Sequence, residues 1–192
     1  LWFEKSFTIT ILDANDAPIA NNQSVTTPED TTLPITLTGY DQDGDLLSFA
    51  VIAQPLHGIL TGTAPNLTYT PAANYNGPDS FTFIANDGNL VSNTATVSIT
   101  VTAVNDAPVA HDKSVATLED TPITISLDAS DVDGDPLNVI MVTSPEHGNV
   151  TISGLDVNYE PSPNYYGTDS FRYKVNDGTA DSNEATVTIT IT

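Results

Sequence analysis

The stretch A-T-V-S-I-T-V-T, residues 95–102, indicates the fold class of this chain. Every second residue is apolar, and Thr or Ser fills the positions between. A period of two that is rich in β-branched residues is typical of a half-buried β-strand. The pattern returns 90 residues later as A-T-V-T-I-T-I-T, residues 185–192. The chain therefore carries the same predicted strand twice.

The whole chain follows this duplication. Residues 15–102 align with residues 105–192 without a gap, and 41 of the 88 pairs are identical. A period of this length is longer than a solenoid unit and predicts tandem domains, each with its own core. We expect the first domain over residues 15–104 and the second over residues 105–192.

Residues 1–14 fit the same register and predict the last strand and the linker of a preceding repeat. Phe7, Ile9 and Ile11 align with the apolar positions of the strand at residues 95–102. The chain opens in the middle of a pattern, so we expect it to be a fragment of a longer protein.

Further strands are predicted by the same alternation. Short strands near Val25 and Gly58–Thr61 bring the number to about seven per repeat, with Pro, Gly, Asn and Asp between them. About 90 residues with seven short strands predict an all-β fold of tandem immunoglobulin-like Greek-key β-sandwiches, without the Cys and Trp signature of antibody domains. The alternating positions are Leu33, Ile35 and Leu37; Leu47, Phe49 and Val51; Leu67 and Tyr69; and Phe81, Phe83 and Ala85.

The charge of the chain excludes several classes of function. It has 25 Asp and Glu against 4 Lys and Arg, for a formal net charge of -21. DNA, RNA and anionic membrane surfaces would be repelled. The self-repulsion also opposes a compact state, and bound divalent cations would relieve it. No cysteine is present, so disulfides and thiolate sites are impossible. No apolar run is long enough to span a bilayer.

The acidic residues of the first repeat recur in the second. Residues 15–104 contain eight acids and no Lys or Arg, and all eight return at the offset of 90. A surface that needed only charge would let these positions vary. The eight are Asp16, Glu29, Asp30, Asp41, Asp43, Asp45, Asp79 and Asp87.

Three of these acids form the motif D-x-D-G-D, at residues 41–45 and again at residues 131–135. An EF-hand calcium loop would need a Glu at position 12, where this chain has Ile52 and Val142. The loop alone therefore does not complete a shell of six to eight oxygens, and further ligands must come from distant segments.

The order of these motifs resembles the cadherin repeat, and in particular the cadherin-like tandem repeats of large bacterial surface and RTX-type adhesins. D-A-N-D-A-P at residues 13–18 is similar to the cadherin linker, Glu29 to its Glu near the first strand, Asp41-x-Asp43 to D-x-D, and Ala85-x-Asp87 to A-x-D. The resemblance covers essentially the whole chain. It implies Ca²⁺ bound where two domains meet, with ligands from both domains and the linker.

The resemblance implies two sets of metal ligands. The junction between the repeats would use Glu29, Asn105, Asp106, Asp131, Asp133 and Asp177. The junction at the start would use Asp13, Asn15, Asp16, Asp41, Asp43 and Asp87, and would be weaker because its upstream domain is absent. Glu119 would serve a further repeat. Ala103 replaces the first linker Asp and Asn74 and Asn164 replace the L-D-R-E region, so we expect fewer or weaker ions than in cadherins.

Structural roles remain open for many of these residues. The D-x-D residues and the N-D-G residues Asp87 and Asp177 are also typical of turns, the latter of type I′ hairpins. Asp45 and Asp135 are interpreted as turn formers. Asp30 and Asp79 are undecided, and Asp79 could accept backbone N–H bonds. His57 and His147, in matching P-x-H-G turns, are interpreted as structural, and Tyr69, Tyr75, Phe81 and Phe83 as core.

No nucleophile motif is present, and the repeated acids fall at loop ends, so we expect no enzymatic activity. The sequence favours a calcium-binding extender module of an extracellular, cell-surface or secreted adhesin. Its expected partners are neighbouring repeats of the same chain. The alternative is a binding module for a surface glycan or protein. The fragment itself is expected to be monomeric.

Overall fold

The computed structural model describes residues 4 and 14–192. These residues form strands and turns, and none of them belongs to a helix that could cross a membrane. The chain divides into two compact units, Leu1–Val104 and Asn105–Thr192, whose described parts we call repeat 1 and repeat 2. The strand predicted at Phe7, Ile9 and Ile11 lies outside the described residues.

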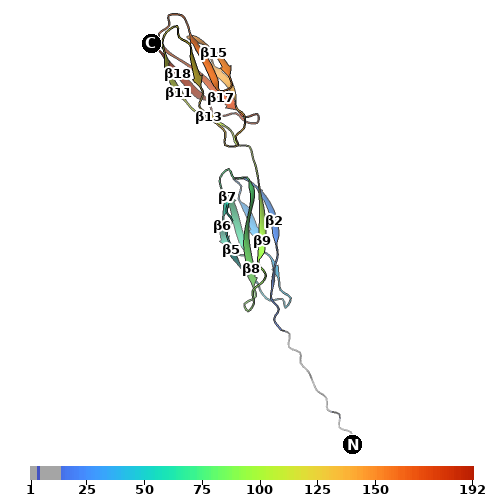
Figure 1. Ribbon diagram of the computed structural model, residues 1–192. Coiled ribbons are helices and arrows are strands. Elements are labelled where there is room, and N and C mark those ends of the chain that lie inside the picture. The colour runs from blue at the N-terminus through green and yellow to red at the C-terminus, as the bar shows by residue number, and fades with distance from the viewer. Residues whose placement is uncertain (1–3, 5–13) are drawn as a thin grey trace. The chain divides into compact units, whose positions relative to one another are not determined.

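Repeat 1 is a two-layered β-sandwich (Figure 1). One sheet has the strand order β2-β9-β8-β5, the other has the order β3-β7-β6, and β1 pairs with β4. Two-residue breaks separate β1 from β2 and β3 from β4, so nine segments correspond to the seven strands predicted. The segments are β1 (Ile19–Ala20), β2 (Gln23–Pro28), β3 (Leu33–Thr36), β4 (Gly39–Tyr40), β5 (Ser48–Ala53), β6 (Gly58–Thr63), β7 (Asn66–Pro71), β8 (Gly77–Asn86) and β9 (Ala95–Thr102).

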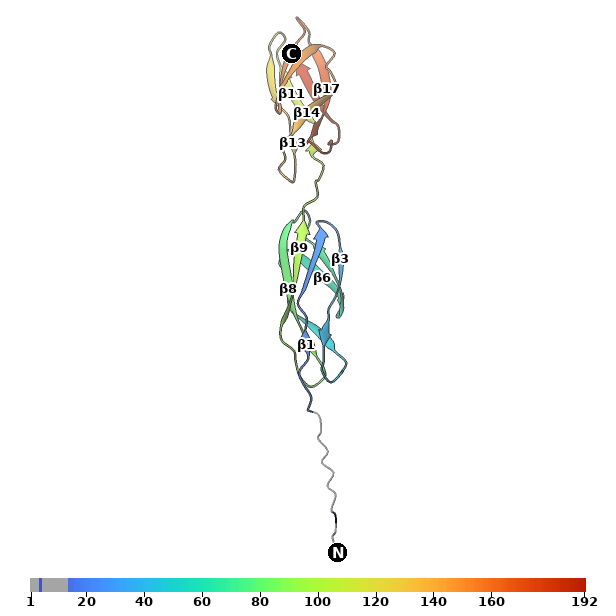
Figure 2. The ribbon, with the colours of Figure 1, turned by 90° about the vertical axis from the view of Figure 1, so that its right-hand side faces the viewer.

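Repeat 2 reproduces this arrangement, with sheets β11-β18-β17-β14 and β12-β16-β15 and the pair β10-β13 (Figure 2). Its segments are β10 (Val109–Ala110), β11 (Lys113–Thr117), β12 (Ile123–Ser126), β13 (Ala129–Ser130), β14 (Asn138–Thr143), β15 (Gly148–Ser153), β16 (Asp156–Pro161), β17 (Gly167–Asn176) and β18 (Ala185–Ile191).

The first long strand of each repeat pairs with the last one. β2 runs parallel to β9, with Val25 opposite Ile99, and β11 runs parallel to β18. The other strand pairs are antiparallel. Between these paired strands the chain passes back and forth between the two sheets of the sandwich. This arrangement confirms the predicted all-β, immunoglobulin-like fold.

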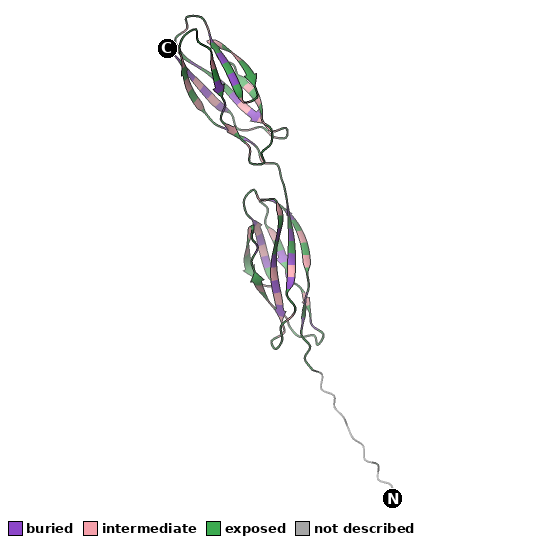
Figure 3. Ribbon diagram, in the orientation of Figure 1, coloured by how far each residue is buried: buried purple, intermediate pink, exposed green. Residues whose placement is uncertain are grey.

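Each repeat has a separate apolar core. Buried and exposed residues alternate along the long strands, as the period of two predicts (Figure 3). Tyr69, Phe83 and Val97 are fully buried in repeat 1, as are Tyr159, Tyr173 and Val187 in repeat 2. The two core clusters draw their residues from one repeat each.

A buried carboxylate organises one end of each core. Asp79 is 8% exposed and accepts hydrogen bonds from the N–H groups of Leu56 and His57, both at 3.0 Å, and from the Tyr69 hydroxyl at 2.8 Å. Asp169 does the same in repeat 2. Of the two roles open for Asp79, the structure supports the backbone acceptor.

The paired histidines also have structural surroundings. The His57 ring stacks on Tyr75 with centroids 4.1 Å apart, and His147 stacks on Tyr165 at 4.0 Å. Both tyrosines pack against the core of their repeat. These contacts support the structural interpretation of the histidines.

Candidate metal centre

The D-x-D-G-D loop of repeat 1 begins where β4 ends. Asp41 Oδ1 accepts hydrogen bonds from the N–H groups of Asp43 at 2.9 Å and Asp45 at 3.1 Å, so Asp41 does hold a turn. Gly44 has φ +82°, a conformation that glycine adopts without strain. Asp41 is only 6% exposed, and its second oxygen, Oδ2, is buried and receives no hydrogen bond from the described residues.

The loop of repeat 2 shares most of these features, although Asp131 is only partly buried. Asp131 Oδ1 accepts the N–H of Asp135 at 3.2 Å, Gly134 has φ +79°, and Asp131 Oδ2 is again buried without a described donor. The same atom therefore has no partner among the described residues in both repeats. In each loop the described hydrogen bonds reach only Oδ1 of the first Asp and leave Oδ2 unsatisfied.

Three carboxylates meet in each loop. One ligand atom each from Asp41, Asp43 and Asp45 lies within 4.8 Å of the others, and the same holds for Asp131, Asp133 and Asp135. The sequence interpretation left Asp45 and Asp135 as turn formers, yet their carboxylates join these groups. The signal was available, because all three acids of the motif recur in both repeats.

The linker motif N-D is bound to the repeat that follows it. In repeat 1, the Asp16 N–H donates to Asp43 Oδ2 at 2.7 Å, and Asn15 Nδ2 donates to Asp87 Oδ2 at 2.9 Å. The equivalent distances in repeat 2 are 2.8 Å and 2.9 Å. The structure thus brings together Asn15, Asp16, Asp41, Asp43 and Asp87 in repeat 1, and Asn105, Asp106, Asp131, Asp133 and Asp177 in repeat 2. Asp13 lies outside the described residues.

The N-D-G residue Asp87 is also held by its own turn. Its Oδ1 accepts the N–H groups of Asn89 at 2.6 Å and Leu90 at 2.7 Å. Four residues separate the bridged pair Asn86 and Val91, so the alternative of a two-residue type I′ hairpin is not what forms. The N–H of Leu90, then the Asn15 amide and the N–H of Asn89, lower the pKa of Asp87.

Removing the linker amide should change the acidity of its partner. The N–H of Ala180, then the Asn105 amide and the N–H of Thr179, lower the pKa of Asp177 from its ordinary value of 3.8. We therefore expect Asn105→Ala to raise that pKa. Because the pKa is lowered in the folded state, the ionised Asp177 stabilises the docked linker at any pH above the ordinary pKa. This stabilisation is lost as the pH falls through the folded-state pKa.

Carboxyl-detected NMR titration of Asp177 would measure this effect. Asp87, whose partner Asn15 is unchanged, is the internal control. An unchanged titration of Asp177 in the variant would show that the Asn105 bond does not persist in solution.

Glu29 lies directly after β2, at the opposite end of this strand from Gln23, and is 3% exposed. Its N–H donates to the Thr102 carbonyl at 2.9 Å, and its Oε1 accepts the N–H of Val104 at 2.6 Å. Its Oε2 is buried without a described donor. Glu119, its counterpart, is exposed and donates its N–H to the Thr192 carbonyl. Glu29 and the predicted ligands of repeat 2 belong to different compact units.

Two successive segments, residues 15–100 and 105–190, match the family model described as bacterial Ig domain. The chain belongs to the bacterial Ig domain family. The Ig repeats are also 29% identical over 173 residues to integrin beta-like protein B of Dictyostelium discoideum, a match that covers 81% of the chain and 9% of that protein. The chain spans a tenth or less of the length of the curated relatives it matches.

Solved cadherin structures share the fold of these Ig repeats. The human mucin-like protocadherin EC1-2 matches with a TM-score of 0.59 at 16% identity, over 91% of this chain and 98% of that one. Human CDH23 EC21-23 matches with a TM-score of 0.61 at 17% identity, over 92% and 70%. The chain is thus a tandem Ig-like, cadherin-like repeat.

Proposed function

We propose that this chain is a calcium-binding extender module of a large extracellular adhesin, in which Ca²⁺ at the junctions between repeats stiffens the tandem array. One observation carries the proposal. Three of the four buried side-chain atoms that lack a partner among the described residues belong to predicted ligands: Glu29 Oε2, Asp41 Oδ2 and Asp131 Oδ2.

A buried carboxylate oxygen without a donor costs free energy, because it has left water and gained nothing in return. A divalent cation bound to this oxygen would offset that cost. Ca²⁺ takes six to eight oxygen ligands, mostly carboxylates and carbonyls, which are the groups this chain supplies. The net charge of -21 favours cation binding for the same electrostatic reason.

The proposed ligands fall into two sets. Glu29, Asn105, Asp106, Asp131, Asp133 and Asp177 would serve the junction between the repeats. Asp13, Asn15, Asp16, Asp41, Asp43 and Asp87 would serve the preceding junction. Without cations the acids of a junction repel one another and the linker bends freely. With Ca²⁺, ligands from neighbouring repeats would share ions, and the hinge would stiffen.

The similarity to integrin beta-like proteins supports an adhesive, extracellular setting for the parent protein. A spacer role also agrees with a repeat in which seven of the eight recurring acids lie outside the strands and the core is apolar. Neighbouring repeats of the same chain are the proposed partners.

Calcium should stabilise the chain and reduce its flexibility. At a concentration about 100 times the Kd, binding adds roughly 2.7 kcal/mol to the unfolding free energy, or about 10–20 °C in Tm for a domain the size of one repeat. Calorimetry and small-angle scattering, each with saturating calcium and with chelator, measure the two effects.

Two variants give this experiment its controls. Glu29→Gln should keep both repeats folded but lose most of the calcium-dependent change in scattering. Glu160→Gln removes one charge from an exposed position on β16 and should behave as the native chain. Equal Tm values and equal dimensions with calcium and with chelator would refute the proposal.

A further inference from the structure

The fifth residue of each D-x-D-G-D loop has a carboxylate that accepts no hydrogen bond from the described residues. Asp45 donates its N–H to Asp41, but no described group donates to its side chain. Asp43, by contrast, accepts the N–H of Asp16 through Oδ2. Asp135 repeats the situation of Asp45 in repeat 2, with its N–H on Asp131. Neither Asp45 nor Asp135 is therefore needed as an acceptor within its turn.

These carboxylates lie near the carboxylate of Asp41 or Asp131, whose Oδ2 is buried without a donor among the described residues. Ligand atoms of Asp41, Asp43 and Asp45 lie within 4.8 Å of one another, a spacing at which one cation can contact all three. Asp41 Oδ2 is the second sign of a ligand, because Asp41 is only 6% exposed and this oxygen is buried without any described partner. Protein folds rarely leave such an atom unsatisfied.

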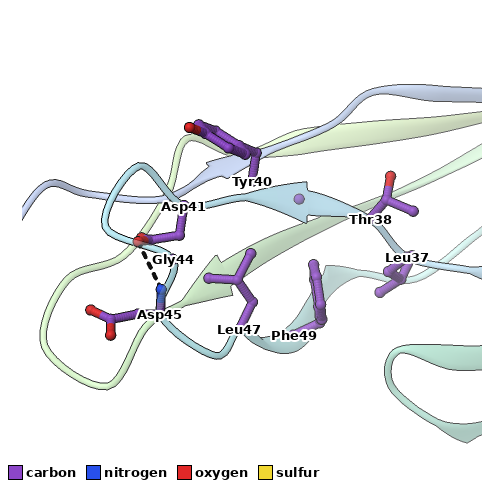
Figure 4. A pocket seen from close by; sticks show the side chains of 9 residues that line it. Leu37, Thr38, Tyr40, Asp41, Gly44, Asp45, Leu47 and Phe49 are labelled. Atoms are coloured by element: carbon purple, nitrogen blue, oxygen red, sulfur yellow. Dashed lines mark hydrogen bonds between the residues drawn. The ribbon is translucent and has the colours of Figure 1, made fainter.

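The loop also has space beside it. A hollow of about 540 Å³ is lined by Asp41, Gly44 and Asp45 together with Leu37, Leu47 and Phe49 (Figure 4). The close-up shows the Asp41 carboxylate facing the turn, bonded to the Asp45 N–H, with the Asp45 side chain beside it. Asp43 and Asp45 are exposed, so water would complete the shell of a cation that these carboxylates hold.

We infer that Asp45 and Asp135 are additional cation ligands, and that each repeat holds a divalent cation of the calcium type in its own D-x-D-G-D loop without any residue of a neighbouring repeat. All three carboxylates of each loop come from one compact unit. The inference takes calcium as the cation from the proposed function. It does not require Glu29 or ligands shared between repeats. Each repeat then carries its cation before the junction forms.

Ion counting on the full 192-residue chain tests this inference. Equilibrium dialysis gives the number of Ca²⁺ ions bound, and titration calorimetry gives their affinities. We expect at least two ions per chain, one for each loop. The double variant Asp45→Asn/Asp135→Asn should weaken both loop ions by about tenfold or more, because each site loses one charged ligand.

Three controls make the result decisive. Glu29→Gln should retain both loop ions, and Glu160→Gln, which removes an exposed charge on β16, should bind as the native chain does. Circular dichroism with hydrogen exchange confirms that each variant is folded, which we expect because the replaced carboxylates accept no described hydrogen bond.

The possible outcomes separate the two proposals. Unchanged binding in the double variant would overturn the inference and leave the junction proposal standing. Loss of all binding in Glu29→Gln would also overturn it, and would favour sites that need both repeats. A native chain that binds no calcium would end both proposals.

Discussion

Replacing Asp79 with alanine should destabilise repeat 1 by about 3–5 kcal/mol, because four donors lose their acceptor and each donor left buried and unpaired costs about 1–3 kcal/mol. The donors are the N–H groups of Leu56, His57 and Ser80, which are partly buried, and the hydroxyl of Tyr69, which is fully buried. The same carboxylate thus links the turn before β6 to the buried Tyr69.

Hydrogen exchange in β8 and β9 would measure this loss. A change of 3–5 kcal/mol corresponds to roughly two to four powers of ten in protection. β17 and β18 of repeat 2, where Asp169 is intact, are the internal control. Asp79→Asn, which keeps one acceptor oxygen, should fall between the native chain and the alanine variant. Native protection in Asp79→Ala would mean that water replaces the carboxylate at little cost.

The same carboxylate makes repeat 1 sensitive to acid. Burial alone would raise the pKa of Asp79, but the hydrogen bonds from Leu56, Tyr69, Ser80 and His57 outweigh it and lower that pKa below 3.8. The stabilisation is therefore complete above the unfolded-state pKa and is lost as pH falls through the folded-state pKa. Burial together with this carboxylate raises the pKa of the Tyr69 hydroxyl far above its ordinary value, so Tyr69 remains a donor.

Gly58→Ala should destabilise repeat 1 by about 3 kcal/mol, at the upper end of the range for overpacked cores. A Cβ at this position would lie 2.4 Å from Tyr69 Cε2 and 2.6 Å from the Thr70 carbonyl oxygen. Neither group can move easily, because the Tyr69 ring is buried and bonded to Asp79, and Thr70 belongs to the β-ladder with β6.

Gly88→Ala is the matched control for this prediction. A Cβ added at Gly88 would meet no described atom within 4 Å, but its φ of +105° disfavours a side chain, so only a backbone cost of about 1–2 kcal/mol is expected. Denaturant unfolding compares the two variants directly. If Gly58→Ala were no worse than Gly88→Ala, the close packing of Tyr69 against this turn would be disproved.

The strands were predictable because their signal is local. Alternation of apolar and polar residues follows from the two faces of a strand, so Phe81, Phe83 and Ala85 could be placed in the core from their spacing alone. The two domains were predictable as well, because the sequence repeats at an offset of 90 residues. The interruption of the first two strands was not predictable, since no Pro or Gly at residues 21–22 marks it.

Part of the candidate site was predictable as well. The N-D linker, the D-x-D motif and Asp87 do come together in each repeat, as the resemblance to cadherins implied. The grouping of Asp45 with Asp41 and Asp43 was missed: the recurrence of all three acids was a signal for it, but Asp45 was interpreted as a turn former.

The sequence by itself determined the β-strands, the duplicated domain and the eight acidic positions that both copies keep. Only the tertiary structure decided which acids are structural. Asp79 and Asp41 are the same residue type at equally repeated positions. Donors 10 to 23 residues away satisfy Asp79, while Asp41 Oδ2 receives no hydrogen bond from the part of the chain that the structure describes. The reason is physical: the state of a buried carboxylate depends on donors that only the folded chain brings within 3 Å.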